Sequence, residues 1–173
     1  MSEESSMPSL VPRTVPAYIH ALDVPHAEPF VCDLRIDHQH SGDSVEHVSN
    51  IEYVRWLDRA AELHADHLGY TRTRMHANGM MWFVVRHEID YLAEAWPGDH
   101  LLLVTWVRDM GRVKSWRDYL LIRPADEVVV CRAATLWVLV DLATRRPRRI
   151  PHEMAKRFGP LSMYRAPQRC TSR

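Results

Sequence analysis

The chain of 173 residues is long enough for one globular domain with a sizeable hydrophobic core and too short for two full domains. Lys and Arg together count 22, as do Asp and Glu, so the chain lacks the basic excess typical of nucleic-acid-binding proteins. The hydrophobic fraction of 46% excludes a disordered chain, and no apolar run approaches the length of a bilayer span, so we expect no membrane span.

The cysteines and the N-terminal residues favour a reduced, cytoplasmic protein. Cys32, Cys131 and Cys170 are odd in number and widely spaced, which predicts neither a disulfide framework nor a cysteine zinc site. The N-terminus is acidic and polar rather than basic and apolar, so we expect no export signal. Glycine-rich phosphate motifs and a His-Glu-x-x-His pattern are absent, and we therefore expect no cofactor and no metal.

The first 29 residues contain five prolines and little apolar periodicity. Because proline fixes φ and disfavours helix in the residue before it, we expect an extended or flexible arm over residues 1–29. The folded domain is predicted at residues 30–160, followed by a C-terminal tail over residues 161–173. The domain is expected to open with a strand at residues 30–37 and a polar loop at residues 38–46.

A long helix is predicted over residues 47–69. At about 100° per residue, most charged side chains fall on one third of its circumference, and the remaining arc is wider than the apolar stripe of an ordinary surface helix. We therefore expect a helix buried on most sides, with Asn50, His64 and His67 on the buried arc. The exposed arc is predicted to hold Glu52, Arg55, Asp58, Arg59, Glu62 and Asp66.

Four further strands with short connections are predicted at residues 81–91, 101–108, 113–122 and 128–140, with a short helix at residues 151–158. One buried helix and about five antiparallel strands predict an α+β fold in which a curved sheet wraps around the helix. That arrangement is the hotdog architecture. Exposed sheet edges readily pair with a second copy, so we expect a homodimer as the minimum assembly.

The segment from Asp43 to Tyr53, DSVEHVSNIEY, resembles the Asp-x-x-Gly-His-Val-Asn-Asn-x-x-Tyr motif of hotdog acyl thioesterases. This family includes 4-hydroxybenzoyl-CoA thioesterase and the acyl-carrier-protein thioesterases. Residues 137–141, 144–147 and 150–151 are similar to the end of the last strand in the same family. The resemblance covers roughly residues 30–158.

Two positions of the motif differ from the family pattern, and a third position differs from the plant-type members. Glu46 stands at the position of the glycine, and Ser49 at that of the first asparagine. Plant-type acyl-carrier-protein thioesterases often carry an asparagine where this chain has Val45. These differences predict a site loop of different shape without one helper side chain.

The resemblance implies hydrolysis of an acyl thioester, with acyl-CoA as the first choice of substrate. It implies that Asp43 acts as general base or as nucleophile, and the sequence does not choose between the two roles. Amides at a helix N-terminus are unpaired and lie at the positive end of the helix dipole. Backbone N–H groups near His47 and Val48 are therefore expected to polarise the thioester carbonyl.

Four residues accompany Asp43 in the predicted site. His47 is expected to orient substrate, carry a proton or hold the loop. Val48 is predicted to contact substrate. Asn50 either braces the loop or touches substrate, because a buried amide needs partners. Tyr53 either lines the acyl pocket or packs in the core.

Two rival functions stay open. One is hydrolysis of an acyl group presented on an acyl carrier protein, and the other is a non-catalytic hotdog that binds an acyl-CoA-like ligand. The presence of Asp43 favours an enzyme, whereas Val45 and Glu46 leave room for a binding protein. The expected partners are the thioester and further copies of the chain, as a homodimer or a dimer of dimers (homotetramer).

Overall fold

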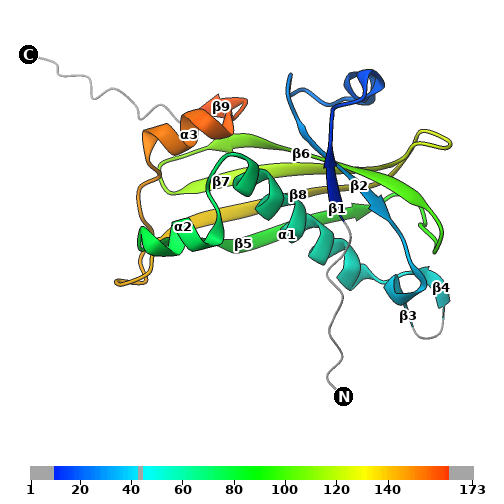
Figure 1. Ribbon diagram of the computed structural model, residues 1–173, viewed down its shortest axis with the longest axis horizontal. Helices are drawn as coiled ribbons and strands as arrows, with labels where there is room; N and C mark the ends of the chain where they lie inside the picture. The colour runs from blue at the N-terminus through cyan, green and yellow to red at the C-terminus, as the bar shows by residue number, and fades with distance from the viewer. Residues whose placement is uncertain (1–9, 43–44, 164–173) are drawn as a thin grey trace, which may run out of the picture.

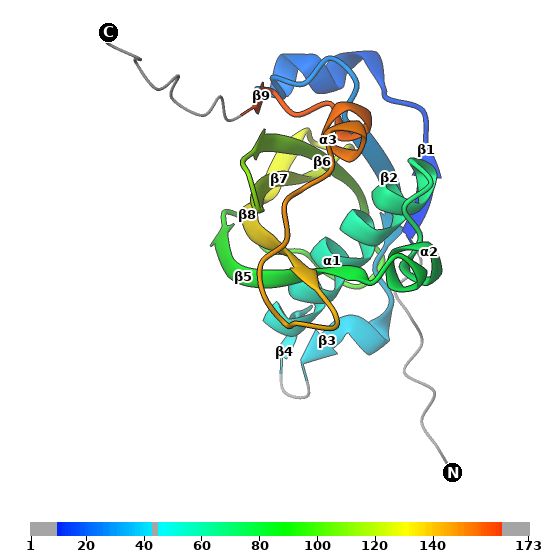
Figure 2. The same cartoon turned by 90° about the vertical axis from the view of Figure 1, so that its left-hand side faces the viewer.

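An antiparallel sheet curves around one long helix in the computed structural model, which describes residues 10–42 and 45–163 (Figure 1, Figure 2). The order along the sheet is β1-β2-β6-β7-β8-β5, and β9 pairs in parallel with β6. The strands are β1 (Leu10–Arg13), β2 (Phe30–Arg35), β5 (Met80–Tyr91), β6 (His100–Met110), β7 (Lys114–Arg123), β8 (Val128–Asp141) and β9 (Ser162–Met163). The predicted α+β hotdog fold is thus confirmed.

The central helix α1 spans Asn50–His67, and the shorter helices are α2 (Arg72–Ala77) and α3 (His152–Phe158). The short segments η1 (Ala17–Leu22) and η2 (His38–His40) are 3-10 helices, and β3 (Ser41–Gly42) pairs with β4 (Val45–Val48). Helix α1 begins three residues later than predicted because the residues before it form β4. Ser49 caps the helix, since its Oγ accepts a hydrogen bond from the Ile51 amide at 3.4 Å.

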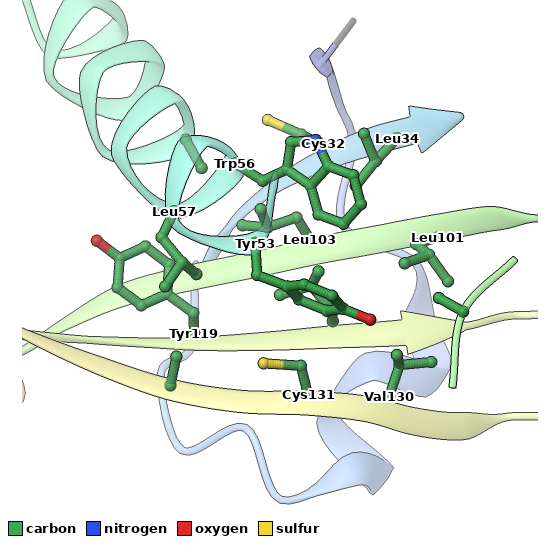
Figure 3. Packing of buried hydrophobic residues seen from close by; sticks show 14 of the residues in the cluster. Cys32, Leu34, Tyr53, Trp56, Leu57, Leu101, Leu103, Tyr119, Val130 and Cys131 are labelled. Carbon is green, nitrogen blue, oxygen red and sulfur yellow. The ribbon is translucent and has the colours of Figure 1, made fainter. Parts of the chain in front are cut away.

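Helix α1 buries one face against the concave side of the sheet. Figure 3 shows its residues Tyr53, Trp56 and Leu57 packed over Leu103 and Tyr119 of the sheet. The buried stripe of the helix consists of Glu52, Tyr53, Trp56, Leu57, Ala60, Ala61 and His64. Buried residues three or four positions apart are typical of a helix that is covered on one side.

The predicted orientation of α1 is wrong in its first turn and at its end. Ile51 is 63% exposed, whereas Glu52, which we expected on the charged face, is 7% exposed. Asn50 and His67 are exposed rather than buried, while the burial predicted for His64 is confirmed. The sheet covers only one side of the helix within a single chain, so the wide apolar arc is not matched by an equally wide buried face.

The N-terminal segment covers the convex side of the sheet. Strand β1 pairs with β2, and Ile19 and Val24 pack among sheet residues that include Val104 and Ile122. Residues 10–29 of the expected extended or flexible arm thus contain a strand and a 3-10 helix, and part of this segment packs on the sheet. Prolines are compatible with an edge strand and a 3-10 turn, and the few apolar residues of this segment are sufficient to dock it.

The structure describes only part of the predicted N-terminal arm and of the predicted C-terminal tail. Residues 162–163 of the predicted tail form β9, and residues 164–173 lie outside the described residues. Within the described part of the chain, no helix combines the length and the apolar composition needed to cross a bilayer.

Candidate active site

Four of the five predicted site residues line one hollow beside the start of α1. Asp43 lies outside the described residues. The hollow has a volume of about 290 Å³. Its lining consists of His47, Val48, Asn50, Tyr53, Tyr91, Leu92, Ala93, Glu94 and Ala95. The structure thus brings the described part of the motif together with the segment that follows β5.

The amide groups at this hollow differ from the expectation. The Val48 N–H donates a hydrogen bond to the Ala95 carbonyl at 3.0 Å, so it is not free to polarise a thioester. The amides of Ile51 and Glu52 are occupied by Ser49. The Asn50 amide has no acceptor within the described residues, and it lies at the positive end of α1. Among the described residues, the Asn50 N–H is therefore open to an incoming oxygen, whereas the Val48 N–H is not.

Tyr53 both packs in the core and borders the hollow, the two alternatives that we expected for it. Its side chain is 3% exposed and belongs to the core cluster, yet it also borders the hollow. Its ring centroid lies 5.1 Å from that of Trp56 and 5.1 Å from that of Tyr91. Burial raises the pKa of the Tyr53 phenol, so the group is neutral at physiological pH. His47 is half-buried and Val48 is buried at the same hollow.

A second carboxylate, Glu94, borders the hollow and was missed by the sequence analysis. Its side chain is exposed, and its backbone carbonyl accepts a hydrogen bond from Arg123 Nη1 at 3.1 Å. Arg123 is in turn paired with Asp99 at 3.1 Å, so the segment is held in place. The only sequence signal was a carboxylate between the end of a predicted strand and a predicted turn.

A larger cavity of about 480 Å³ lies between the second half of α1 and the sheet. This volume is in the range of sites for small organic molecules. Its apolar lining includes Met75, Met81, Trp82, Phe83, Val107, Met110, Trp137 and Phe158. This cavity could not be predicted from the sequence, because its walls come from helices and strands far apart in the chain.

Cysteine and metal chemistry find no support in the described residues. Burial raises the pKa of the Cys32 and Cys131 thiols to about 12, which keeps both protonated at neutral pH. In residues 10–42 and 45–163, no three His, Cys, Asp or Glu side chains are grouped as metal ligands would be.

The curved sheet, its central helix and the hollow at the helix start define a hotdog fold of the thioesterase type. The chain belongs to the thioesterase-like superfamily, whose family model matches residues 38–158. The matched residues include the motif, the central helix α1 and the four long strands β5 to β8.

Individual relatives agree with this assignment. The chloroplastic acyl-carrier-protein hydrolase FATB3 of Cuphea viscosissima is 27% identical over 125 residues, or 72% of this chain. The chain spans only 30% of that relative's length. A 1,4-dihydroxy-2-naphthoyl-CoA thioesterase from Synechocystis superposes with a TM-score of 0.70 at 18% identity, over 77% of this chain and 97% of its own. The 12:0-ACP thioesterase from Umbellularia californica superposes with a TM-score of 0.66 at 24% identity, over 78% of this chain and 54% of its own.

Proposed function

We propose that this chain hydrolyses an acyl thioester, with acyl-CoA as the substrate, in the hollow at the start of α1. One observation carries the proposal: His47, Val48, Asn50 and Tyr53 of the motif border a single hollow at a helix N-terminus. A helix N-terminus stabilises negative charge, which is what develops on a thioester oxygen under attack. Membership of the thioesterase-like superfamily supports the same reaction class.

The proposed mechanism divides the work between a carboxylate and an amide. Asp43 either removes a proton from the attacking water or attacks the thioester carbon itself. The Asn50 N–H donates a hydrogen bond to the carbonyl oxygen as its negative charge grows. Where water attacks, the carbon–sulfur bond then breaks, and the leaving thiolate takes up the proton that Asp43 removed. Where Asp43 attacks, loss of the thiolate leaves an acyl anhydride on Asp43, and water hydrolyses this anhydride to the free acid, restores the carboxylate and supplies the proton of the thiol. His47 borders the hollow, where it can orient the thioester.

We also propose that the active assembly is a homodimer formed through β5. This strand is an edge of the sheet, and Phe83, Val84 and Val85 are each at least 40% exposed on it. An unpaired edge with apolar side chains favours pairing with another strand. A two-fold axis near the middle of β5 pairs the strands antiparallel, which brings the larger cavity of one copy toward the hollow of the other.

A carrier-bound acyl group is the second candidate substrate. The sequence similarity to a relative described as an acyl-carrier-protein hydrolase favours this candidate. The arm that presents the acyl group is a phosphopantetheine thiol in both CoA and carrier protein. The reacting atoms are therefore the same in the two cases, and only the contacts outside the hollow differ.

A panel of thioesters tests the proposal. Purified full-length protein is incubated with acyl-CoAs of varied chain length and aromatic content, and with the same acyl groups on an acyl carrier protein. Thiol release is measured in both arms. Turnover in the CoA arm supports the proposal, and turnover in the carrier arm alone selects the second candidate. Acyl-CoA binding without thiol release in either arm would leave the non-catalytic hotdog as the function.

A further inference from the structure

Arg117 lies in the wall of the larger cavity without an acidic partner. The residue is 4% exposed and projects from β7 toward α1. Its Nη1 donates hydrogen bonds to His64 Nδ1 at 2.9 Å and to Thr105 Oγ1 at 3.2 Å. In residues 10–42 and 45–163, its Nε and Nη2 groups have no acceptor, and no Asp or Glu lies within 4.0 Å of the guanidinium.

A buried cation of this kind normally faces an anion. Burial lowers the pKa of the Arg117 guanidinium, but arginine remains charged in proteins because its intrinsic pKa is so high. An uncompensated buried charge is among the most destabilising features a fold can contain. His64 does not compensate it, because this imidazole is neutral and accepts only one hydrogen bond from it.

Trp137 borders the same cavity on the neighbouring strand. Trp137 pairs with Ser115 across β7 and β8, and Thr135 pairs with Arg117 in the adjoining row. The indole Nε1 of Trp137 is buried beside the Tyr119 phenol, so it is not open to a ligand. Arg117 therefore lies next to Trp137 in a cavity whose walls are mostly apolar and also include carboxylates of α1.

The acidic residues of α1 at this cavity do not neutralise Arg117. Glu62 pairs with Arg72 at 2.5 Å, and Asp58 pairs with the same arginine at 3.4 Å. Asp66 also borders the cavity, without an ion pair to Arg117. Apart from a cation–π contact with Phe158, whose ring centroid lies 5.9 Å from Arg117 Cζ, the charge is left for a molecule that enters the cavity.

We propose that this cavity binds the far end of the acyl group, and that this end carries a carboxylate that pairs with Arg117. The substrate class is then monothioesters of dicarboxylic acids with an apolar middle section. This inference rests on the proposed thioester hydrolysis for the reaction, while the binding of the carboxylate stands on the cavity alone. A fork of guanidinium N–H groups matches a carboxylate in geometry as well as charge.

The test compares acyl groups that differ only at their far end. Hydrolysis is measured for octanoyl-CoA against suberoyl-CoA and for decanoyl-CoA against sebacoyl-CoA. Binding of the free acids, decanoic against sebacic, is followed by calorimetry and by tryptophan fluorescence, since Trp82 and Trp137 border the cavity. The variants are Arg117→Met and Arg117→Lys. The matched control is Arg108→Met, because Arg108 is a sheet arginine outside the cavity, paired with Asp118 at 3.1 Å.

We expect the wild type to favour the carboxylate-ended member of each pair by about tenfold or more, the usual scale for a hydrogen-bonded charge. Arg117→Met should reduce that ratio to about one, Arg117→Lys should reduce it in part, and Arg108→Met should keep it. Preference of the wild type for the methyl-ended members, with thiol release intact, overturns this inference and leaves the proposed function standing. Tighter binding of sebacic acid than of decanoic acid, without any thiol release, supports this inference and overturns the proposed function. If neither acid binds and no thiol is released, both are wrong.

Discussion

Arg117 Nη1 donates a hydrogen bond to His64 Nδ1 at 2.9 Å, so the His64 imidazole is the acceptor and carries its own proton on Nε2. The ring stacks on Phe30 with centroids 5.0 Å apart. Burial, and next the charge of Arg117, lower the pKa of His64 to about 2. The contact therefore links a helix histidine to a sheet arginine only while the histidine is neutral.

The first prediction follows from this pair. In the unfolded chain His64 takes up a proton as the pH falls through about 6.5, whereas in the folded protein it does not until about pH 2. Below pH 6.5 the unfolded state thus binds one more proton, and the free energy of unfolding should decrease by about 1.4 kcal/mol per pH unit from this residue. His64→Gln keeps an acceptor for Arg117 but does not titrate, so its stability should fall less steeply between pH 6.5 and 5. Urea unfolding at a series of pH values measures the difference.

His67→Gln is the matched control for that experiment, because His67 is on the same helix but exposed. Its stability should follow the wild type at every pH. Parallel curves for His64→Gln and the wild type would show that His64 is protonated in the folded protein, contrary to the prediction.

The second prediction concerns the β5 edge. Val84→Lys together with Val85→Lys places charge on an exposed apolar edge without disturbing the core, and should convert a dimer to a monomer. Val11→Lys alters a valine on β1, the opposite edge, that is also exposed, and should leave the dimer intact. Sedimentation at micromolar concentration shows whether each variant is a dimer or a monomer. A wild type that sediments as a monomer refutes the proposed assembly.

The third prediction concerns the N-terminal segment on the convex face. Ile19 is fully buried, so Ile19→Ala should destabilise the fold by about 2–5 kcal/mol. That loss corresponds to a decrease in Tm of roughly 5–15 °C for a chain of this size. Val11→Ala, at a position 57% exposed, should melt close to the wild type. Deletion of residues 1–29 should lower Tm at least as much as Ile19→Ala, and a deletion variant that melts like the wild type would show that the segment is dispensable.

The long strands and the central helix were predictable because their signals are local. Alternating apolar residues and turn residues located β5 to β8 within a few positions, and helical periodicity located α1. The N-terminal segment was not predictable in the same way. Ile19 and Val24 show no period that marks them as buried, and only the sheet face formed by distant strands provides a surface for them.

The site was predictable in part for the same reason. The motif located His47, Val48, Asn50 and Tyr53 at one hollow because all four are close in sequence. The hydrogen bond that occupies the Val48 amide could not be predicted, since its acceptor, Ala95, is far along the chain. Arg117 gave no signal at all, because a charged residue in a strand is usually solvated and its burial depends on which face α1 covers.

The most direct test of the account is the hydrolysis rate of Asp43→Asn. The substitution keeps the shape of the side chain and removes its charge, so kcat for the best acyl-CoA of the panel should fall at least ~100-fold, the scale for loss of a general base. Asp23→Asn removes an exposed carboxylate from a loop on the convex side and should match the wild type. Equal melting temperatures establish that both variants are folded. A rate for Asp43→Asn equal to that of the wild type would contradict the proposed mechanism.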